Sequence, residues 1–153
     1  MNKAMKDHQL ARQLRTVFNG KAWYGKNVSN TLQGIPYDKV LRRMGASHNI
    51  AELVHHMMAW HNYVIHVILN REHLEVSDAV NFPKITVLSE VDWHKVLVSF
   101  AENQTRLEQY FEDDINLDEK IPNKDYTYQE LLQGIIHHDI YHAGQINLLA
   151  NHS

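Results

Sequence analysis

Residues 49–70 of the chain read NIAELVHHMMAWHNYVIHVILN, a run without proline or glycine. Its apolar side chains recur every three or four positions, which is the spacing that aligns them on one face of an α-helix. This stripe comprises Ile50, Leu53, Met57, Trp60, Val64 and Ile68. Ser47 or Asn49, just before it, is a suitable N-cap. We therefore expect a long amphipathic helix from about Asn49 to Asn70.

Three further segments show the same helical spacing. One covers about residues 3–18, one begins at Ser89, and one begins at the capping box Thr127-Tyr128-Gln129-Glu130 and runs to about Ala150. The connections span residues 21–43, 71–87 and 113–125, the last a polar loop, and residues 37–43 can form a short linker helix. No apolar–polar alternation predicts a strand. The expected fold class is all-α, a four-helix bundle with long connections.

Composition narrows the function classes. The 153 residues suit a single domain, residues 1–153, and the net charge of −3 comes without a basic block that could follow a phosphate backbone. We therefore expect no nucleic-acid partner. No apolar signal core or membrane-spanning stretch is visible, so we expect a cytoplasmic protein with no membrane partner. The chain has no cysteine, which excludes disulfides, cysteine-bound zinc and a cysteine nucleophile.

The chain holds twelve histidines, scattered rather than in a tag-like run, and their positions on the helices separate them. At about 100° per residue, His142 falls near the centre of the apolar stripe of the last helix and His138 about 50° from it. His137 points away. In the helix over residues 49–70, His56 lies at the edge of the stripe, and His61 lies close enough to be a rival.

Two interpretations of these inward histidines remain open at this point. Because His138 and His142 are spaced i, i+4, both rings can reach one ion, and His56 or His61 can complete a three-histidine metal site. Alternatively, each ring is a hydrogen-bonded core residue. The H-E-x-x-H pattern of zinc proteases is absent, because Asp139 follows His138.

The two histidine segments resemble one known family. Residues 50–60, IAELVHHMMAW, resemble the second-helix motif I-x-E-h-h-x-H-x-x-x-W of the DinB-like superfamily, in which h is apolar. Residues 138–146, HDIYHAGQI, are similar to its H-x-x-Y/x-H-x-G-Q-I motif, and residues 22–25, AWYG, resemble its Trp-x-Gly loop more weakly. The resemblance covers essentially the whole chain. It places His56, rather than His55 or His61, at the ligand position beside His138 and His142.

The resemblance implies a four-helix bundle in which three histidines hold a divalent ion, zinc or nickel being the leading choices. Characterised relatives include bacillithiol S-transferases and mycothiol-dependent isomerases. We therefore expect a metal-dependent enzyme that joins a low-molecular-weight thiol to a small electrophile. A metal-dependent hydrolase and a non-enzymatic, stress-related metal-binding protein are the alternatives. The substrate would be a small molecule, and the sequence leaves open whether the chain is a monomer or a homodimer.

Several residues near the motifs are candidates for supporting roles around the site. Glu52, one turn before His56, can orient that imidazole or lie solvated on the helix surface. Gln145 can hydrogen-bond a ligand at the metal or cap a polar core pocket. Trp60 is expected in the core, whereas Trp23, in a loop with Tyr24, is expected to form a pocket wall or lid.

Two further positions carry structural expectations. For Asp139, a salt bridge to another helix is preferred over an orienting role. The helical Gly144 predicts close approach of a neighbouring segment, because glycine in a helix otherwise costs about 1 kcal/mol relative to alanine.

Overall fold

The structure, a computed structural model, describes residues 3–111 and 115–152. The helices are α1 (Lys3–Phe18), α2 (Val28–Gln33), α3 (Ile50–Asn70), α4 (Asp78–Asn81), α5 (Glu90–Phe111) and α6 (Tyr128–Asn151), with one 3-10 turn, η1, at Tyr37–Lys39. No strand forms within the described ranges. The all-α prediction is confirmed.

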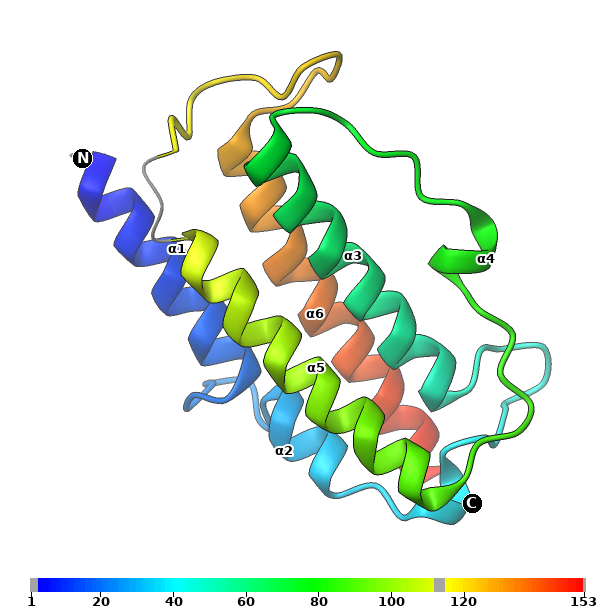
Figure 1. Ribbon diagram of the computed structural model, residues 1–153. Coiled ribbons are helices and arrows are strands. Elements are labelled where there is room, and N and C mark those ends of the chain that lie inside the picture. Colours follow the sequence, from blue (N-terminus) through cyan, green and yellow to red (C-terminus); the bar gives the residue numbers. More distant parts are fainter. Residues whose placement is uncertain (1–2, 112–114, 153) are drawn as a thin grey trace.

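The four long helices pack into a bundle in which each contacts two others. α3 lies between α5 and α6, and α1 contacts both α5 and α6 on the opposite side. Figure 1 shows α3 and α5 running in one direction, with α1 and α6 running in the other. Because α3 and α5 are parallel, the chain must cross the length of the bundle between them. That crossover carries α4 along the outer side of α3 (Figure 1).

The helix boundaries match the sequence expectations closely. α1 has the expected limits, and α5 begins one residue after Ser89. The expected capping box forms at Thr127, and Asn49, one of the two expected N-caps of α3, also forms a capping box. Helices α2 and α4 were not predicted, since six and four residues are too few to show a period. The linker helix expected over residues 37–43 is shorter, a single turn ending at Lys39.

The connection before α6 corrects the expectation of a purely polar loop over residues 113–125. Residues 113 and 114 lie outside the described residues. In the remainder, Ile115, Leu117 and Ile121 are each less than 4% exposed and belong to the core. Their burial stabilises the loop against the helix ends, since burying such a side chain is worth about 1.5–3 kcal/mol.

Among the described residues, no helix combines the length and apolar character that crossing a bilayer requires.

Candidate metal centre

Three histidines meet between α3 and α6. His56 comes from α3, and His138 and His142 come from successive turns of α6. One nitrogen from each ring lies within 4.8 Å of the others, and the Nε2 atoms of His56 and His138 are 2.9 Å apart. His56 and His142 are buried, while His138 is partly exposed. We call these three residues the triad.

Hydrogen bonds fix the tautomers of two triad rings. The Nδ1–H of His56 donates to the main-chain oxygen of Asn81 at 2.8 Å. The Nδ1–H of His142 donates to Oε1 of Gln145 at 2.7 Å. A neutral imidazole carries one N–H, so both rings keep an unprotonated Nε2, and that of His56 accepts the Nε2–H of His138. Metal-binding histidines are oriented in this same way by an acceptor at the second nitrogen.

The surroundings of the rings favour their neutral form. Burial lowers the pKa of His142 to about 4, and the nearby His138 ring lowers it further than burial alone would. Burial also lowers the pKa of His56, against the opposing effect of the hydrogen bond to Asn81. Neutral imidazoles are the form that binds a metal ion. Three imidazole nitrogens that converge in a bundle suit a borderline divalent cation such as zinc or nickel, so the residues present fit the ion.

The crossover between α3 and α5 contributes two residues that the sequence did not suggest. Besides the bond to His56, Asn81 accepts a hydrogen bond from the Trp60 indole N–H at 3.0 Å. The ring of Phe82 is stacked between His56 and His48, with centroid distances of 3.9 Å on both sides. The last residue of α4 and its C-cap therefore hold the His56 ring in place by a hydrogen bond and by stacking. No sequence pattern singled out these two residues, because apolar side chains such as Leu74, Val76 and Ile85 are scattered through the whole connection.

His61, the rival ligand, has another partner. Its Nε2 lies 2.9 Å from both carboxylate oxygens of Asp139, and both side chains are fully buried. Burial alone would raise the pKa of Asp139, but the adjacent His61 and His138 rings outweigh it and lower the pKa. This confirms the preferred interpretation of Asp139 as a cross-helix salt bridge. His61 is a core residue and lies outside the triad.

A sequence model of the DinB superfamily matches residues 23–146, a span that includes all three triad histidines. The chain belongs to the DinB superfamily. Searches of curated proteins and of solved structures gave no match. Membership confirms the resemblance found in the two histidine motifs. The cluster of His56, His138 and His142 agrees with the metal-binding character of the DinB superfamily.

Glu52, which belongs to the DinB motif of α3, serves the neighbouring loops rather than His56. Its carboxylate forms a two-pronged ion pair with Arg43 and accepts the Ile85 N–H at 2.9 Å. It also lies 3.2 Å from Nδ1 of His48. Burial would raise the pKa of Glu52, but these bonds lower it to about 2. The side chain is 2% exposed, so neither the orienting nor the solvated role that we expected describes it.

The other residues singled out in the sequence are distributed around the triad. Gln145 orients His142 and donates to the Tyr141 hydroxyl at 3.1 Å, which ties the ring to the helix surface. Trp60 is half-buried, with its ring centroid 6.1 Å from that of His138. Trp23 is 96% exposed, and its ring contacts Tyr24.

Two expectations from the loop and from α6 are wrong. The loop of Trp23 lies against the other face of α6, where Tyr24 and Gly144 line a separate pocket, so Trp23 is not a wall of the site. The close approach expected at Gly144 is absent from the described part of the chain, because a Cβ added there meets nothing within 4 Å.

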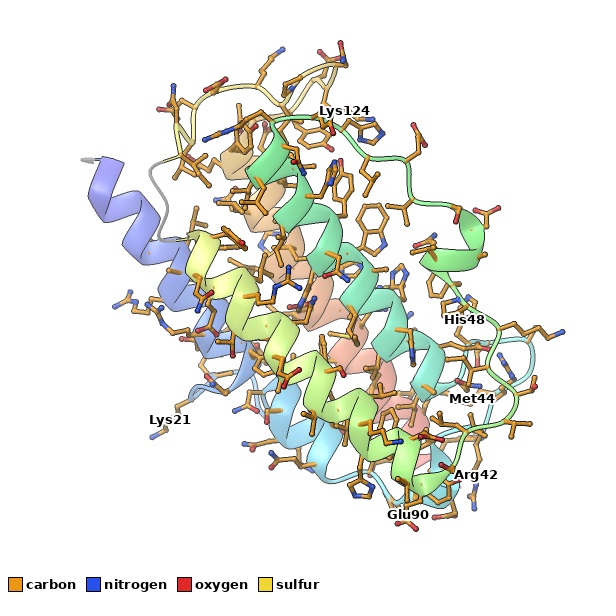
Figure 2. All side chains as sticks on the ribbon, viewed as in Figure 1. Lys21, Arg42, Met44, His48, Glu90 and Lys124 are labelled. Carbon is orange, nitrogen blue, oxygen red and sulfur yellow. The ribbon has the colours of Figure 1, made fainter. Side chains whose placement is uncertain are left out.

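A pocket of about 630 Å³, a volume typical of small-molecule sites, opens onto two triad residues, His56 and His142. We call it the Gln145 pocket. Its walls include His56, His142, Phe82 and Gln145, together with Ser47 and His48. Figure 2 shows His48 and Met44, another lining residue, in the loop before α3, on the same side of the bundle as α4. The triad can therefore be reached by a small molecule from outside.

Proposed function

We propose that the protein is a metal-dependent enzyme that transfers a low-molecular-weight thiol to a small electrophile. The observation that carries this proposal is the triad itself. Three imidazoles converge without a carboxylate among them, and two of them, His56 and His142, line an accessible pocket. Three protein ligands are typical of catalytic sites, in which an ion keeps a position for substrate. A site closed by a fourth protein ligand would instead favour a structural role.

The nucleophile must come from outside the chain, because the sequence contains no cysteine. A divalent ion held by the triad would supply a positive charge that lowers the pKa of a thiol, so that the thiolate forms at neutral pH. The proton leaves to solvent through the pocket mouth. The sulfur then forms a bond to the electrophilic carbon as the leaving group departs with its bonding electron pair. We also propose the cytoplasm as the compartment, since thiols are kept reduced there.

The chain's own residues orient the site and admit the thiol. Asn81 and Gln145 hold the His56 and His142 rings with their unprotonated nitrogens inward. Phe82 covers one face of His56 and shields it from water. Ser47 and His48, on the wall of the Gln145 pocket, can hydrogen-bond the amide and carboxylate groups that low-molecular-weight thiols carry.

Cobalt substitution tests this function directly. Adding a low-molecular-weight thiol to the cobalt-loaded protein should produce sulfur-to-cobalt charge-transfer absorption. The His142→Ala variant should lose both this absorption and thiol transfer. The matched control is His137→Ala, which changes an exposed histidine on the same helix and should behave as the parent does.

The other outcomes are equally specific. If thiols leave the spectrum unchanged while a cobalt-bound water still exchanges, the thiol proposal fails and a metal-dependent hydrolase replaces it. If the cobalt site takes up neither thiol nor exchangeable water, the protein is a metal-binding protein without this enzymatic role.

A further inference from the structure

A second pocket reaches the triad from the opposite side. It occupies about 440 Å³ between the C-terminal half of α3 and the N-terminal half of α6, and His138 forms its inner wall. We call it the Trp60 pocket. Its other walls include Trp60, Tyr63, Leu131, Gly134 and Ile135. The triad therefore lies between two pockets, with His138 facing this one and His56 and His142 facing the Gln145 pocket.

The Nδ1 atom of His138 has no hydrogen-bond partner among the described residues but is itself buried, and the polar groups of Trp60 and Tyr63 at the Trp60 pocket are already hydrogen-bonded elsewhere. The Trp60 N–H is bonded to Asn81, and the Tyr63 hydroxyl lies 3.0 Å from Nδ1 of His73 and 3.1 Å from the Tyr126 hydroxyl. The remaining contribution of these side chains to the pocket is the apolar surface of their rings. A ligand that brought its own polar groups here would lose their hydration without replacement partners, which is costly.

The two pockets also differ in the charge of the side chains around them. Glu130 lines the Trp60 pocket, where it accepts the Thr127 N–H of the capping box at 2.7 Å. Its pKa is lowered by that main-chain hydrogen bond, so it is ionised at neutral pH and disfavours an anion. The Gln145 pocket instead has His48 on its wall, and Arg42 and Arg43 line an adjoining pocket that shares Met44 with it. Anionic groups are therefore better accommodated on the Gln145 side.

Gly134 keeps the Trp60 pocket open. A Cβ added at this position meets nothing within 4 Å, although the residue lies in the middle of a long helix. Glycine there costs about 1 kcal/mol relative to alanine. A larger side chain at position 134 would project into the pocket rather than into the core.

We propose that the Trp60 pocket binds the neutral aromatic part of the electrophile while the thiol enters through the Gln145 pocket. Aromatic side chains favour offset or edge contacts with a flat ring, and Trp60 and Tyr63 already meet edge to face at 5.2 Å. The roles of the two reactants rest on the function proposed above, whereas the ligand class of the pocket does not. With 1-chloro-2,4-dinitrobenzene, the sulfur bonds to the ring carbon that carries chlorine. Chloride leaves with the electrons of the broken bond, and the thiol proton goes to solvent.

Two helical glycines of α6 provide a matched test. Gly134→Leu fills the Trp60 pocket, whereas Gly144→Leu adds the same side chain where a Cβ is equally unhindered but faces the separate pocket of Tyr24. Binding of the unreactive 2,4-dinitroaniline to the metal-loaded protein is measured by equilibrium dialysis. Gly134→Leu should weaken it by about tenfold or more. Gly144→Leu should bind as the parent does. His142→Ala, which we expect to be metal-free, is compared with the metal-free parent and should retain binding, because His142 does not line this pocket.

Steady-state kinetics provide a second test of the Trp60 pocket. Gly134→Leu should raise the KM for 1-chloro-2,4-dinitrobenzene while leaving that for iodoacetamide, a small electrophile without a ring, unchanged. Unaltered dinitroaniline binding in Gly134→Leu, or an equal change for both electrophiles, would overturn the proposal. If Gly134→Leu loses helix content by circular dichroism, Gly134→Ala replaces it, with an expected loss of about two- to threefold.

The two proposals fail separately. If dinitroaniline binding responds to Gly134→Leu but no thiol transfer occurs with any electrophile, the aromatic site stands and the proposed enzymatic function falls. If transfer occurs but Gly134→Leu changes neither binding nor KM, the enzyme stands and the assignment of the Trp60 pocket falls.

Discussion

Helices α3 and α6 share two histidine sites, and one of them contains a carboxylate while the other does not. In the core, His61 is bound by both oxygens of Asp139. In the triad, His56 and His142 donate to neutral oxygens of Asn81 and Gln145. A histidine beside a carboxylate is stabilised in its protonated form, whereas one beside neutral acceptors keeps a free lone pair at neutral pH. The first arrangement is a buried histidine–carboxylate pair, and the second can bind a cation.

The acids closest to the triad in sequence are both committed to other partners. Asp139 follows His138 directly, yet its nearest oxygen is 3.9 Å from Nδ1 of His138, beyond hydrogen-bond reach. Glu52 lies one turn before His56 but binds Arg43. The helix directs each acid away from the ring beside it in sequence. The triad is therefore left with imidazole nitrogens alone as its ligand atoms.

The largest expected effect is the loss of metal on removal of a triad ring. His56→Ala, His138→Ala and His142→Ala should each lower divalent-metal affinity by at least about a thousandfold, or about 4 kcal/mol. His61→Leu should retain metal if the contrast between the clusters is correct. Metal content after dialysis at neutral pH, determined by elemental analysis, measures both. Parent-level metal in His56→Ala would contradict the assignment.

The second expected effect concerns stability. His61→Leu leaves Asp139 buried without its partner, and breaking such a pair typically costs about 3–5 kcal/mol. The free energy of unfolding of the metal-free protein, from denaturant titration, should fall by that amount. Replacing both residues by leucine should recover most of the loss, because the uncompensated charge is then gone. An equal loss of unfolding free energy in the single and double variants would show that the cost does not come from an unpaired Asp139 carboxylate.

Glu52 extends the comparison to an acid paired with arginine. Its pKa is lowered to about 2 from an ordinary 4.5, so its contribution to stability is complete above about pH 4.5 and disappears as the pH falls toward 2. That shift corresponds to roughly 3 kcal/mol. Unfolding free energies at pH 6, 4 and 3 should therefore converge for the parent and Glu52→Gln as the pH falls.

The matched control for Glu52 is Glu130, the equivalent capping-box residue of α6 but an exposed one. Glu130→Gln should change stability little at any of these pH values, because surface hydrogen bonds are screened by water. A pH-independent difference between the parent and Glu52→Gln would argue against an ionised, buried Glu52.

The smallest expected effect comes from the neutral acceptors of the triad. Gln145→Ala removes the bond that orients His142, and loss of such a bond typically lowers metal affinity by about 10–100-fold. We expect about tenfold, since the ring remains packed against Tyr141. Gln145→Glu keeps an acceptor for the Nδ1–H of His142 and makes that ring more basic. This variant should therefore bind the metal at least as tightly as Gln145→Ala does. Competition with a chromophoric chelator gives both affinities.

Helical periodicity was sufficient to predict α1, α3, α5 and α6, and it placed His138 and His142 on the inner face of α6. The choice of His56 over His61 came from the family motif, because both lie near the stripe of α3 and the difference depends on Asp139, 78 residues away. Asn81 and Phe82 were not predictable. They belong to a four-residue helix and its C-cap, which have no sequence period, and they reach His56 only because the crossover runs beside α3.

The central claim is that His56, His138 and His142 hold one divalent ion, with Asn81 and Gln145 orienting the rings of His56 and His142. Anomalous diffraction from crystals of zinc-loaded protein, recorded on both sides of the zinc absorption edge, tests it most directly. The account predicts one strong peak between α3 and α6, bonded to one nitrogen from each of the three rings, with His61 still paired to Asp139. A peak bonded to His61, or zinc only on exposed histidines such as His48 or His152, would contradict it.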